Sequence, residues 1–431
     1  MTPTAAPAAS PDAPRARHGE RQPHKSPFNV IAVVAALGYF VDIYDLILFG
    51  IVRKPSLEAL GFKGAALTSE GAALLNWQMA GTLIGGVLWG IIGDKRGRLS
   101  VLFGSIILYS LANIANGLVT DTTQYAALRF IAGIGLAGEL GAGVTLVNET
   151  MTKEMRGWGT TLVASFGVLG AVLAFWVGDA TDWRTAYFVG GGLGLALLVL
   201  RFSTYESGMF TKVRHAQHAL QLARFDLLLA RPRRLLKYLA CIGVGLPIWF
   251  TIGILVFFAD TFAKALGVAE PVSPGNAIMW AYVGLAAGDL SSGWLSQLLR
   301  SRRRAILGFV LALVVIDGLY LVMVGNSRDG FYLMCALAGF AAGYWALFVT
   351  MASEQFGTNI RATVTTTVPN FVRGAVVPIT LAWQALKDGS LGLGGGTALV
   401  GAVCFGLALW SLAYLPETFG KDLDYTEGEP T

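Results

Sequence analysis

The chain has 431 residues, of which 54% are hydrophobic and only 14% are Asp, Glu, Lys or Arg. A soluble globular domain carries about 25% charged residues, so this composition excludes an ordinary soluble fold and indicates a membrane protein. The net charge of +5 does not require a nucleic-acid partner, because basic residues also gather in the inner loops of membrane proteins.

Residues 1–27 are rich in Ala, Pro, Arg and His and predict a disordered cytoplasmic tail. This tail is not a cleaved signal peptide, because the first apolar run after it is long enough to span a membrane. Apolar segments of about 20 residues, the length that crosses a bilayer, then recur along the chain. The predicted spans cover 28–52, 73–93, 99–119, 124–148, 158–179, 185–202, 236–263, 274–298, 305–325, 330–352, 362–386 and 394–415.

The longest hydrophilic interruption, 203–235, divides these spans into two sets of six. We expect a six-helix bundle at 28–202, a cytoplasmic linker at 203–235 with an amphipathic helix at 216–230, a second bundle at 236–418 and a cytoplasmic tail at 419–431. Most Lys and Arg residues fall on one side of this topology, which places both termini in the cytoplasm. The predicted fold is an all-α membrane protein with twelve transmembrane helices in two pseudo-symmetric six-helix bundles.

The two halves of the chain repeat a short charged pattern. Glu149 precedes Arg156 by the same spacing that separates Glu354 from Arg361, and a pair of threonines follows each arginine at the same distance. The two copies are about half the chain apart. Duplication of this kind in a polytopic membrane protein is typical of transporters.

A glycine-rich loop between the second and third spans carries the strongest local motif. It resembles the signature loop of the major facilitator superfamily, and the matching residues are Gly90, Asp94, Lys95, Gly97 and Arg98. Three further segments resemble the sugar-porter and metabolite:proton symporter branches of that superfamily, and the resemblance covers about 28–418. These segments are Arg129–Glu139 on span 4, Asp182–Arg184 before span 6 and Leu415–Thr418 after span 12.

The resemblance implies a cytoplasmic gate. In the family, Asp, Arg and Glu side chains in the cytoplasmic loops hold the two bundles together in the outward-open state. By resemblance, we expect this gate to be formed by Asp94, Arg98, Glu149, Arg156, Glu354 and Arg361. The alternative is that these residues are ordinary interfacial charges in contact with water.

Charged side chains within the first and fourth spans are candidates for proton coupling, because ionisable groups are costly inside a membrane. Asp42 and Asp45 are three residues apart, so they share one face of a helix. Arg129 is expected at the depth of Asp45 and resembles the arginine that couples to protons in some sugar porters. Pairing favours the carboxylate and apolar surroundings favour the neutral acid, so switching between the two would carry a proton. The alternative is a structural ion pair that never titrates.

Two other carboxyls keep more than one interpretation. Asp42 has no obvious arginine at its level, and it is a candidate for substrate binding or for the proton carrier itself. Glu139 lies nearer the cytoplasmic half of span 4, where it is either a second proton site or a packed carboxyl.

The second half contributes Arg373, about 18 Å into its helix and near the membrane midplane. Pro369 and Pro378 flank it, and such interrupted helices line the binding sites of transporters. An arginine here could hold a substrate carboxylate through two hydrogen bonds. The alternative is an ion pair with Asp289 or Asp317, of which Asp317 is the weaker candidate for the pathway because span 9 is peripheral in the family.

Aromatic and amide side chains on the spans expected near the centre are candidates for substrate contact, although each could equally pack against neighbours or face lipid. Together they would allow a cation–π or stacking site. The surrounding background, rich in Ala, Val and Leu, suggests a small, partly apolar substrate rather than a polyhydroxylated sugar. With Arg373, the candidate substrate-binding residues are Asn370, Gln78, Trp77, Trp249, Trp280, Tyr344 and Trp345.

The sequence has no complete phosphate-binding loop, and its three cysteines and four histidines have no metal-site spacing. We therefore expect no enzyme activity, no cofactor and no metal. The expected partners are a small-molecule substrate, protons and the lipid bilayer, without nucleic acid, and the protein is expected to be a monomer.

Three functions remain compatible with the sequence. The first is a secondary active transporter that works by alternating access and takes up a small organic anion or zwitterion with protons across a bacterial inner membrane. The second is an exporter, antiporter or facilitator of a small amphipathic or metal-linked substrate, although span 5 lacks the Gly-Pro pair usual in drug antiporters. The third is a membrane receptor that does not pump, which would have no need of the gate residues.

Overall fold

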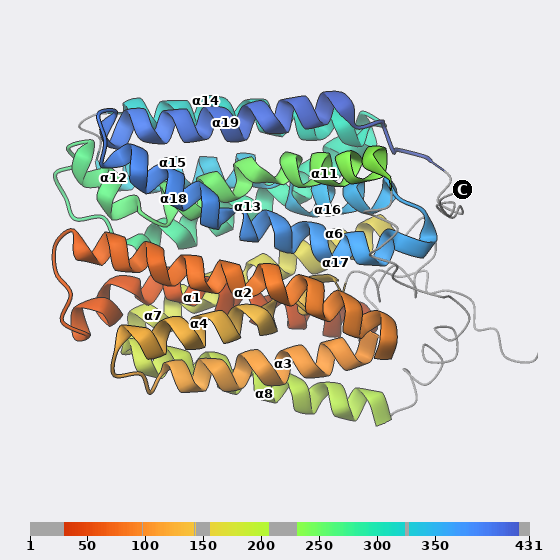
Figure 1. Ribbon diagram of the computed structural model, residues 1–431, viewed down its shortest axis with the longest axis horizontal. Coiled ribbons are helices and arrows are strands. Elements are labelled where there is room, and N and C mark those ends of the chain that lie inside the picture. The colour runs from red at the N-terminus through yellow and green to blue at the C-terminus, as the bar shows by residue number, and fades with distance from the viewer. Residues whose placement is uncertain are drawn as a thin grey trace, which may run out of the picture.

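The computed structural model describes residues 30–96, 98–141, 143, 156–206, 231–323 and 327–421, and within these ranges every regular element is a helix. The helices run side by side along the long axis (Figure 1). Helices of the first half are α1 (Val30–Ala59), α2 (Ala66–Arg96), α3 (Arg98–Asn116), α4 (Thr122–Leu136), α6 (Arg156–Val168), α7 (Gly170–Ala180) and α8 (Trp183–Glu206).

The second half begins with α11 (Pro232–Phe250), which continues through the π-helical turn η1 (Thr251–Val256) and the short α12 (Ala259–Ala265). The remaining helices are α13 (Pro274–Leu298), α14 (Arg302–Val322), α15 (Arg328–Ala342), α16 (Trp345–Glu354), α17 (Thr358–Gly374), α18 (Val376–Lys387) and α19 (Gly392–Tyr414). We call the end at which α2 and α19 end the terminal end (right in Figure 1). The opposite end, which holds residues 60–65, 117–121 and 181–182, is the distal end (left in Figure 1).

Each predicted span contains helix, and the predicted all-helical membrane fold is confirmed. Within the described ranges, eight helices are long and apolar enough to cross a membrane. Helix bounds differ from the predicted spans where a helix continues past the apolar segment, as α1 does to Ala59. Hydropathy marks the segment in hydrocarbon and not the end of hydrogen bonding. The predicted surface helix at 216–230 lies outside the described residues.

Several helices of the second half are interrupted near their middle. Pro247 lies inside α11 just before the π-helical turn, and Pro369 lies inside α17 before the break at Ala375. A proline inside a helix removes one backbone hydrogen bond and bends the chain. The sequence prediction of interrupted helices around the centre therefore holds for the helix that carries Arg373.

Glycines set equivalent close contacts in the two halves. A Cβ atom added to Gly81 of α2 would lie 2.2 Å from the Phe130 carbonyl oxygen of α4, and one added to Gly284 of α13 would lie 2.0 Å from the Ala336 carbonyl oxygen of α15. Such approach of two backbones requires residues without side chains. The second and fourth helices of each half are therefore packed in the same way, as the repeat in the sequence predicts.

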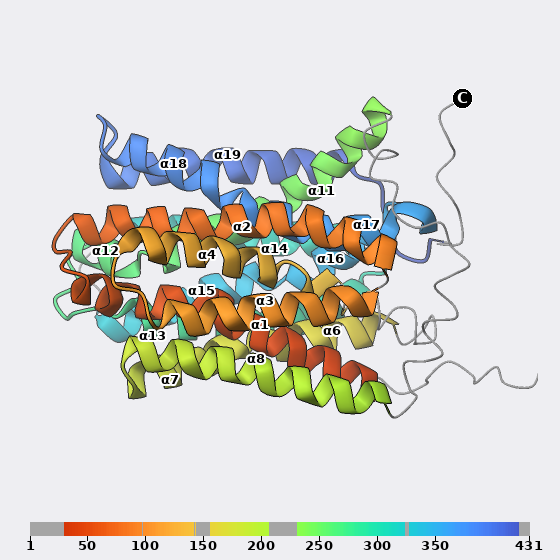
Figure 2. The same ribbon diagram turned by 60° about the horizontal axis from the view of Figure 1, so that its bottom comes forward.

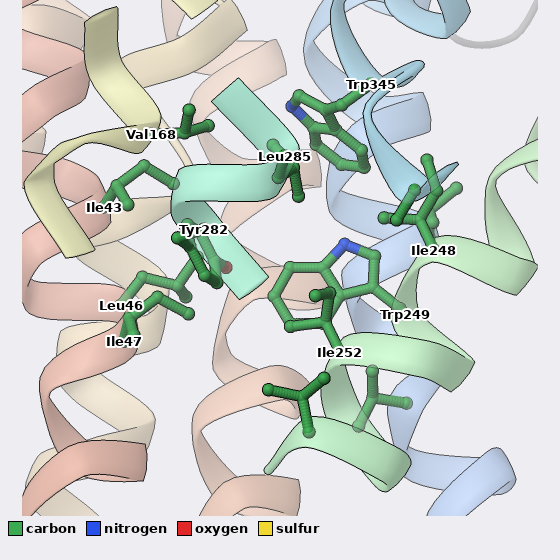
Figure 3. Close-up of a cluster of buried hydrophobic side chains, with 14 of the residues drawn as sticks. Ile43, Leu46, Ile47, Val168, Ile248, Trp249, Ile252, Tyr282, Leu285 and Trp345 are labelled. Carbon is green, nitrogen blue, oxygen red and sulfur yellow. The ribbon is translucent and has the colours of Figure 1, made fainter. Parts of the chain in front are cut away.

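The two halves meet along a buried apolar interface. Figure 3 shows side chains of the first half facing side chains of the second half across it. Towards the terminal end α17 also lies along α2 (Figure 2), where a Cβ on Gly86 would lie 2.8 Å from Cβ of Asn370. The labelled residues of this interface are Ile43, Leu46, Ile47, Val168, Ile248, Trp249, Ile252, Tyr282, Leu285 and Trp345.

Candidate functional site

The carboxyl of Asp42 and the guanidinium of Arg373 form an ion pair between the two bundles. Arg373 Nη2 lies 3.8 Å from Asp42 Oδ2, and the two side chains are 1% and 0% exposed. Neither Asp42 oxygen has a hydrogen-bond partner among the described residues, and the same holds for Nε and Nη1 of Arg373. Buried charged groups normally use all of these positions. The pair therefore keeps hydrogen-bonding capacity that another polar group could use.

The alternative partners considered for Arg373 have other roles. Asp289 Oδ1 accepts a hydrogen bond of 3.0 Å from the backbone N–H of Ala346, in the first turn of α16. Asp317 Oδ2 accepts one of 2.6 Å from Thr251 Oγ1, where the π-helical turn begins. Asp289 thus caps the start of α16, where a helix leaves backbone N–H groups unpaired. Asp317 instead binds a side-chain hydroxyl of the π-helical turn. The alternative of an ion pair with one of these acids is thus not what this conformation shows, since Arg373 meets Asp42.

Aromatic rings surround the Asp42–Arg373 pair. The Arg373 guanidinium carbon lies 5.7 Å from the centre of the Trp345 ring, within the range of a cation–π interaction. Tyr39 is 2% exposed and Tyr282 is 3% exposed. Both lie within range of an electrostatic interaction with Asp42 and Arg373. Trp249 lies near Tyr282 on the apolar interface (Figure 3). The surroundings of the pair are flat, apolar and drawn from both bundles.

Asp45 and Arg129 lie together, as their depths predict, but their contact involves the backbone. Arg129 Nη2 donates to the Asp45 carbonyl oxygen at 3.4 Å, and Arg129 Nη1 donates to the Tyr187 hydroxyl at 3.3 Å. Both carboxyl oxygens of Asp45 are buried without a hydrogen-bond partner among the described residues. In this conformation the Asp45 carboxyl therefore lies near the Arg129 guanidinium but does not bind it directly.

Glu139 forms an ion pair inside the first bundle with Arg201 of α8. Arg201 Nη1 donates to Glu139 Oε2 at 3.0 Å, and Nη2 contacts Oε1. Gly38 of α1 makes room for both side chains. Sequence reasoning missed Arg201 because it lies near the end of a span, where a long cationic side chain is expected to reach the membrane surface. The structure turns it inward instead.

The predicted substrate-contact residues separate into buried and exposed groups. Trp77 and Trp280 are 52% and 43% exposed, which places much of each ring on the outer surface of the helices. Tyr344 donates to the Val244 carbonyl oxygen at 3.1 Å, inside the second bundle. Trp249 and Trp345 are the aromatic candidates that the structure brings to the central interface.

The two amide candidates bridge helices. Gln78 Nε2 donates to the Leu46 carbonyl oxygen at 2.9 Å within the first bundle. Asn370 Nδ2 donates to the Ala137 carbonyl oxygen at 2.8 Å, which links the second bundle to the first. Asn370 therefore contributes to contact between the bundles on the side of the centre that faces the terminal end.

Only part of the predicted cytoplasmic gate lies in the described region. Glu149 and the side chains of Asp94, Arg98 and Arg156 are outside it. Glu354 accepts a hydrogen bond of 2.7 Å from Thr418 Oγ1 and lies 3.5 Å from Arg302 Nη2, both in the second bundle. Arg361 Nη2 donates to the Phe356 carbonyl oxygen at 3.1 Å. The gate as a whole stays a prediction.

The segment that follows α19 caps another helix at the terminal end. Glu417 accepts hydrogen bonds from the backbone N–H groups of Arg302 and Arg303 and from Ser301 Oγ, at the start of α14. Partial burial opposes ionisation of this carboxyl, but these hydrogen bonds outweigh it and lower the pKa of Glu417 below its usual value. The Leu415–Thr418 motif therefore ties the chain end to the second bundle.

An ion pair that sequence reasoning missed joins the bundles at the distal end. Arg53 Nη2 of α1 lies 2.8 Å from Asp260 Oδ1 of α12, with side chains 1% and 27% exposed. The Arg53 guanidinium also lies over the rings of Phe257 and Phe258, at 5.2 and 4.9 Å. The two partners are too far apart in the chain for spacing to indicate a contact. We call Arg53, Asp260, Phe257 and Phe258 the distal latch.

No group of three His, Cys, Asp or Glu side chains in the described ranges is placed to bind a metal ion. The cysteines at positions 241, 335 and 404 are buried and free. The chemistry of the described site is therefore that of carboxyls, guanidinium groups and aromatic rings.

Comparison with known proteins matches residues 35–377 to the family model described as Major Facilitator Superfamily. The chain is similar to a putative metabolite transport protein of Haemophilus influenzae, at 26% identity over 90% of this chain and 96% of the relative. It is also similar to the niacin transporter NiaP of Acinetobacter baylyi, at 25% identity over 76% and 80% of the two chains. Its fold matches that of the proton:xylose symporter XylE with a TM-score of 0.66 and 16% identity, over 91% of this chain and 97% of the other. With two similar helical bundles, buried charges at their interface and a family match over most of its length, the chain belongs to the Major Facilitator Superfamily of transporters.

Proposed function

We propose that this protein takes up a small organic anion together with protons, across a bacterial inner membrane with both termini in the cytoplasm. The observation that carries the proposal is the buried Asp42–Arg373 pair between the two bundles. The relative that transports niacin, a small aromatic carboxylate, supports the same class of substrate.

Competition for Arg373 would couple substrate to proton. A substrate carboxylate that binds the unused Nε and Nη1 positions of Arg373 would neutralise the guanidinium in place of Asp42. Asp42 would then be a buried carboxyl without a counter-charge, a state that favours the neutral acid. Substrate binding would therefore draw a proton onto Asp42, and substrate release would return Asp42 to Arg373 as a carboxylate.

The aromatic side chains near the pair support a planar substrate. The Trp345 ring lies beside the Arg373 guanidinium, and Trp249 and Tyr282 contribute rings to the same apolar interface (Figure 3). Flat apolar rings bind flat ligands with little loss of conformational freedom, and the single guanidinium fixes the orientation of the carboxylate. An aromatic or conjugated carboxylate meets these conditions better than a sugar, which would require many hydrogen-bonding groups.

Alternating access would require contacts between the bundles to break in turn at the two ends. At the distal end, which the expected orientation places outside, the distal latch joins α1 to α12. Asn370 joins the bundles towards the terminal end, and the predicted gate residues of the cytoplasmic loops would act beyond it. We propose that substrate reaches Arg373 from outside when the distal latch opens.

The test uses the purified protein in proteoliposomes with an inward proton gradient and a panel of labelled carboxylates, namely nicotinate, benzoate and cis,cis-muconate. We expect accumulation of at least one of them. Asp42→Asn should abolish accumulation against a concentration gradient while retaining exchange of labelled for unlabelled substrate. Arg373→Ala should abolish both. Asp317→Asn is the matched control, because this buried carboxyl also lies in a span but, among the described residues, bonds only Thr251.

The same vesicles distinguish uptake from export. A proton-coupled antiporter would accumulate substrate when the proton gradient is directed outwards, and a receptor that does not pump would show binding without accumulation. Either result would replace the proposal, as would full accumulation by Asp42→Asn.

A further inference from the structure

A line of polar groups inside the first bundle leads from the distal end to Asp45. The Tyr125 hydroxyl lies 3.4 Å from Ser56 Oγ and 2.6 Å from the Tyr187 hydroxyl, and Arg129 Nη1 contacts the Tyr187 hydroxyl at 3.3 Å. All of these side chains are buried. We call Ser56, Tyr125 and Tyr187 the hydroxyl chain. Each of its members can donate and accept a hydrogen bond.

Beyond Arg129, the line continues as side chains of α3 that lack partners. Asn113 lies beside the Asp45 carboxyl. Both polar side-chain atoms of Asn113, the hydroxyls of Ser110 and Tyr109 and both oxygens of Asp45 are buried without a hydrogen-bond partner among the described residues. An unpaired buried polar group is energetically costly, so such a cluster favours a hydrogen-bonding guest such as water.

The local packing directs Asp45 towards this line and away from the other bundle. A Cβ atom on Gly190 of α8 would lie 2.3 Å from Asp45 Oδ1, and one on Gly194 would lie 2.0 Å from Ser110 Oγ. The glycines of α8 thus leave space that the polar groups of α1 and α3 occupy. Asp42, one turn earlier in α1, faces Arg373 instead. The two carboxyls share one face of α1 but meet different neighbours, Asp42 the second bundle and Asp45 the interior of the first.

We propose that protons reach Asp45 along the hydroxyl chain inside the first bundle, separately from the route between the bundles that the substrate takes. The inference rests on the proposed function, since it assigns the entry path of the coupled proton. In the structure the Tyr125 hydroxyl donates to Ser56 Oγ, and Ser56 Oγ donates to the Arg53 carbonyl oxygen, so both hydroxyls first rotate to point inwards. Ser56 then accepts a proton at the distal end, each hydroxyl oxygen accepts one proton and passes on its own, and rotation of the hydroxyls restores the starting arrangement. Past Arg129, water held by Asn113 and Ser110 carries the proton from the Tyr187 hydroxyl to the Asp45 carboxylate, and Asp45 then supplies Asp42. Arg129 keeps its proton throughout.

Separate routes have a functional consequence. Substrate that fills the space beside Arg373 would not block the supply of protons, so Asp45 can be protonated before, during or after substrate binding. The other interpretation of Tyr125 and Tyr187 is purely structural, because they also form an aromatic cluster with Trp183. If the hydroxyls carry protons, proton entry and proton-driven accumulation require their oxygens, but exchange does not. If their role is structural, all three activities depend on them equally.

The test removes single oxygen atoms. Tyr125→Phe and Tyr187→Phe keep the rings, and Tyr320→Phe is the matched control, since Tyr320 is a buried tyrosine of the second bundle whose hydroxyl donates to the Leu255 carbonyl oxygen. Proteoliposomes containing a trapped pH-sensitive dye report proton entry, and the labelled carboxylate that the wild-type protein accumulates reports uptake and exchange. We expect proton entry and accumulation to fall about tenfold or more in the first two variants, with exchange unchanged. The control should match the wild-type protein.

Two results would overturn the proposal. Normal proton entry in the Tyr125→Phe, Tyr187→Phe double variant would show that the hydroxyl chain is not needed. Equal loss of exchange and proton entry in both single variants would show a structural role. Asn113→Leu provides a second check, because it alters the inner part of the line without touching the aromatic cluster. Failure of the proposed function itself is distinct, because the wild-type protein would then show no substrate-dependent proton entry.

Discussion

Asp42 in α1 and Arg373 in α17 lie 3.8 Å apart, both buried, although they belong to different bundles. The attraction between them favours the conformation in which the bundles meet at this point. Its strength depends on the charge of Asp42 and on any other anion near Arg373. A pair of this kind links the energetics of conformational change to proton and anion binding.

Removing one member of this pair should cost more stability than removing both charges. Arg373→Ala leaves the Asp42 carboxyl without a counter-charge, and we expect it to destabilise the protein by about 3–5 kcal/mol. Addition of Asp42→Asn should recover much of this loss, since no buried charge then remains. Thermal unfolding in detergent of the wild type, both single variants and the double variant measures the coupling. Simple additivity of the two effects would contradict an interaction.

The Glu139–Arg201 pair should behave in the same way within the first bundle. Arg201→Met leaves Glu139 buried and unpaired, with an expected loss of about 3–5 kcal/mol, and Glu139→Gln should reverse much of it in the double variant. The transport assay decides the open role of Glu139. Normal proton-driven accumulation by a stable Glu139→Gln, Arg201→Met protein would assign the pair to packing, and selective loss of accumulation would assign Glu139 to the proton path.

Weakening the distal latch should expose the interface beneath it. Asp260→Asn removes the charge that holds Arg53, so the distal end should open more often. A cysteine introduced in place of Ile278, which is 2% exposed, should then react faster with a membrane-impermeant maleimide added outside. The matched control is Glu270→Gln, which removes an exposed ion pair with Arg328 and should leave the labelling rate unchanged. Equal rates in Asp260→Asn and wild type would rule out a gating role.

Stability should depend on pH through Glu417. Because hydrogen bonds lower its pKa in the folded protein, its ionised form stabilises the fold above the unfolded-state pKa, and this contribution is lost as pH falls through the lower folded value. Glu417→Gln should therefore reduce the melting temperature at pH 7, with an effect on the order of the 1 kcal/mol typical of helix caps. The difference from wild type should shrink below about pH 4. A difference that is constant with pH would contradict this account.

The sequence by itself determined the membrane class, the helical spans, the duplication and the family, because each depends on hydropathy or on short motifs within a continuous segment. It also identified most of the charged residues in the spans, including Asp42, Asp45, Arg129, Glu139 and Arg373, since any such residue stands out in an apolar background.

Only the tertiary structure decided the partners of these charges. Arg373 meets Asp42, Glu139 meets Arg201 and Arg53 meets Asp260, and sequence reasoning proposed none of these contacts. The physical reason is that helices in a bilayer can be apolar on every face, so hydropathy does not fix the rotation of one helix against another. That rotation depends on close packing at glycines and on breaks such as those in α11 and α17, and it determines which charges meet across the bundles.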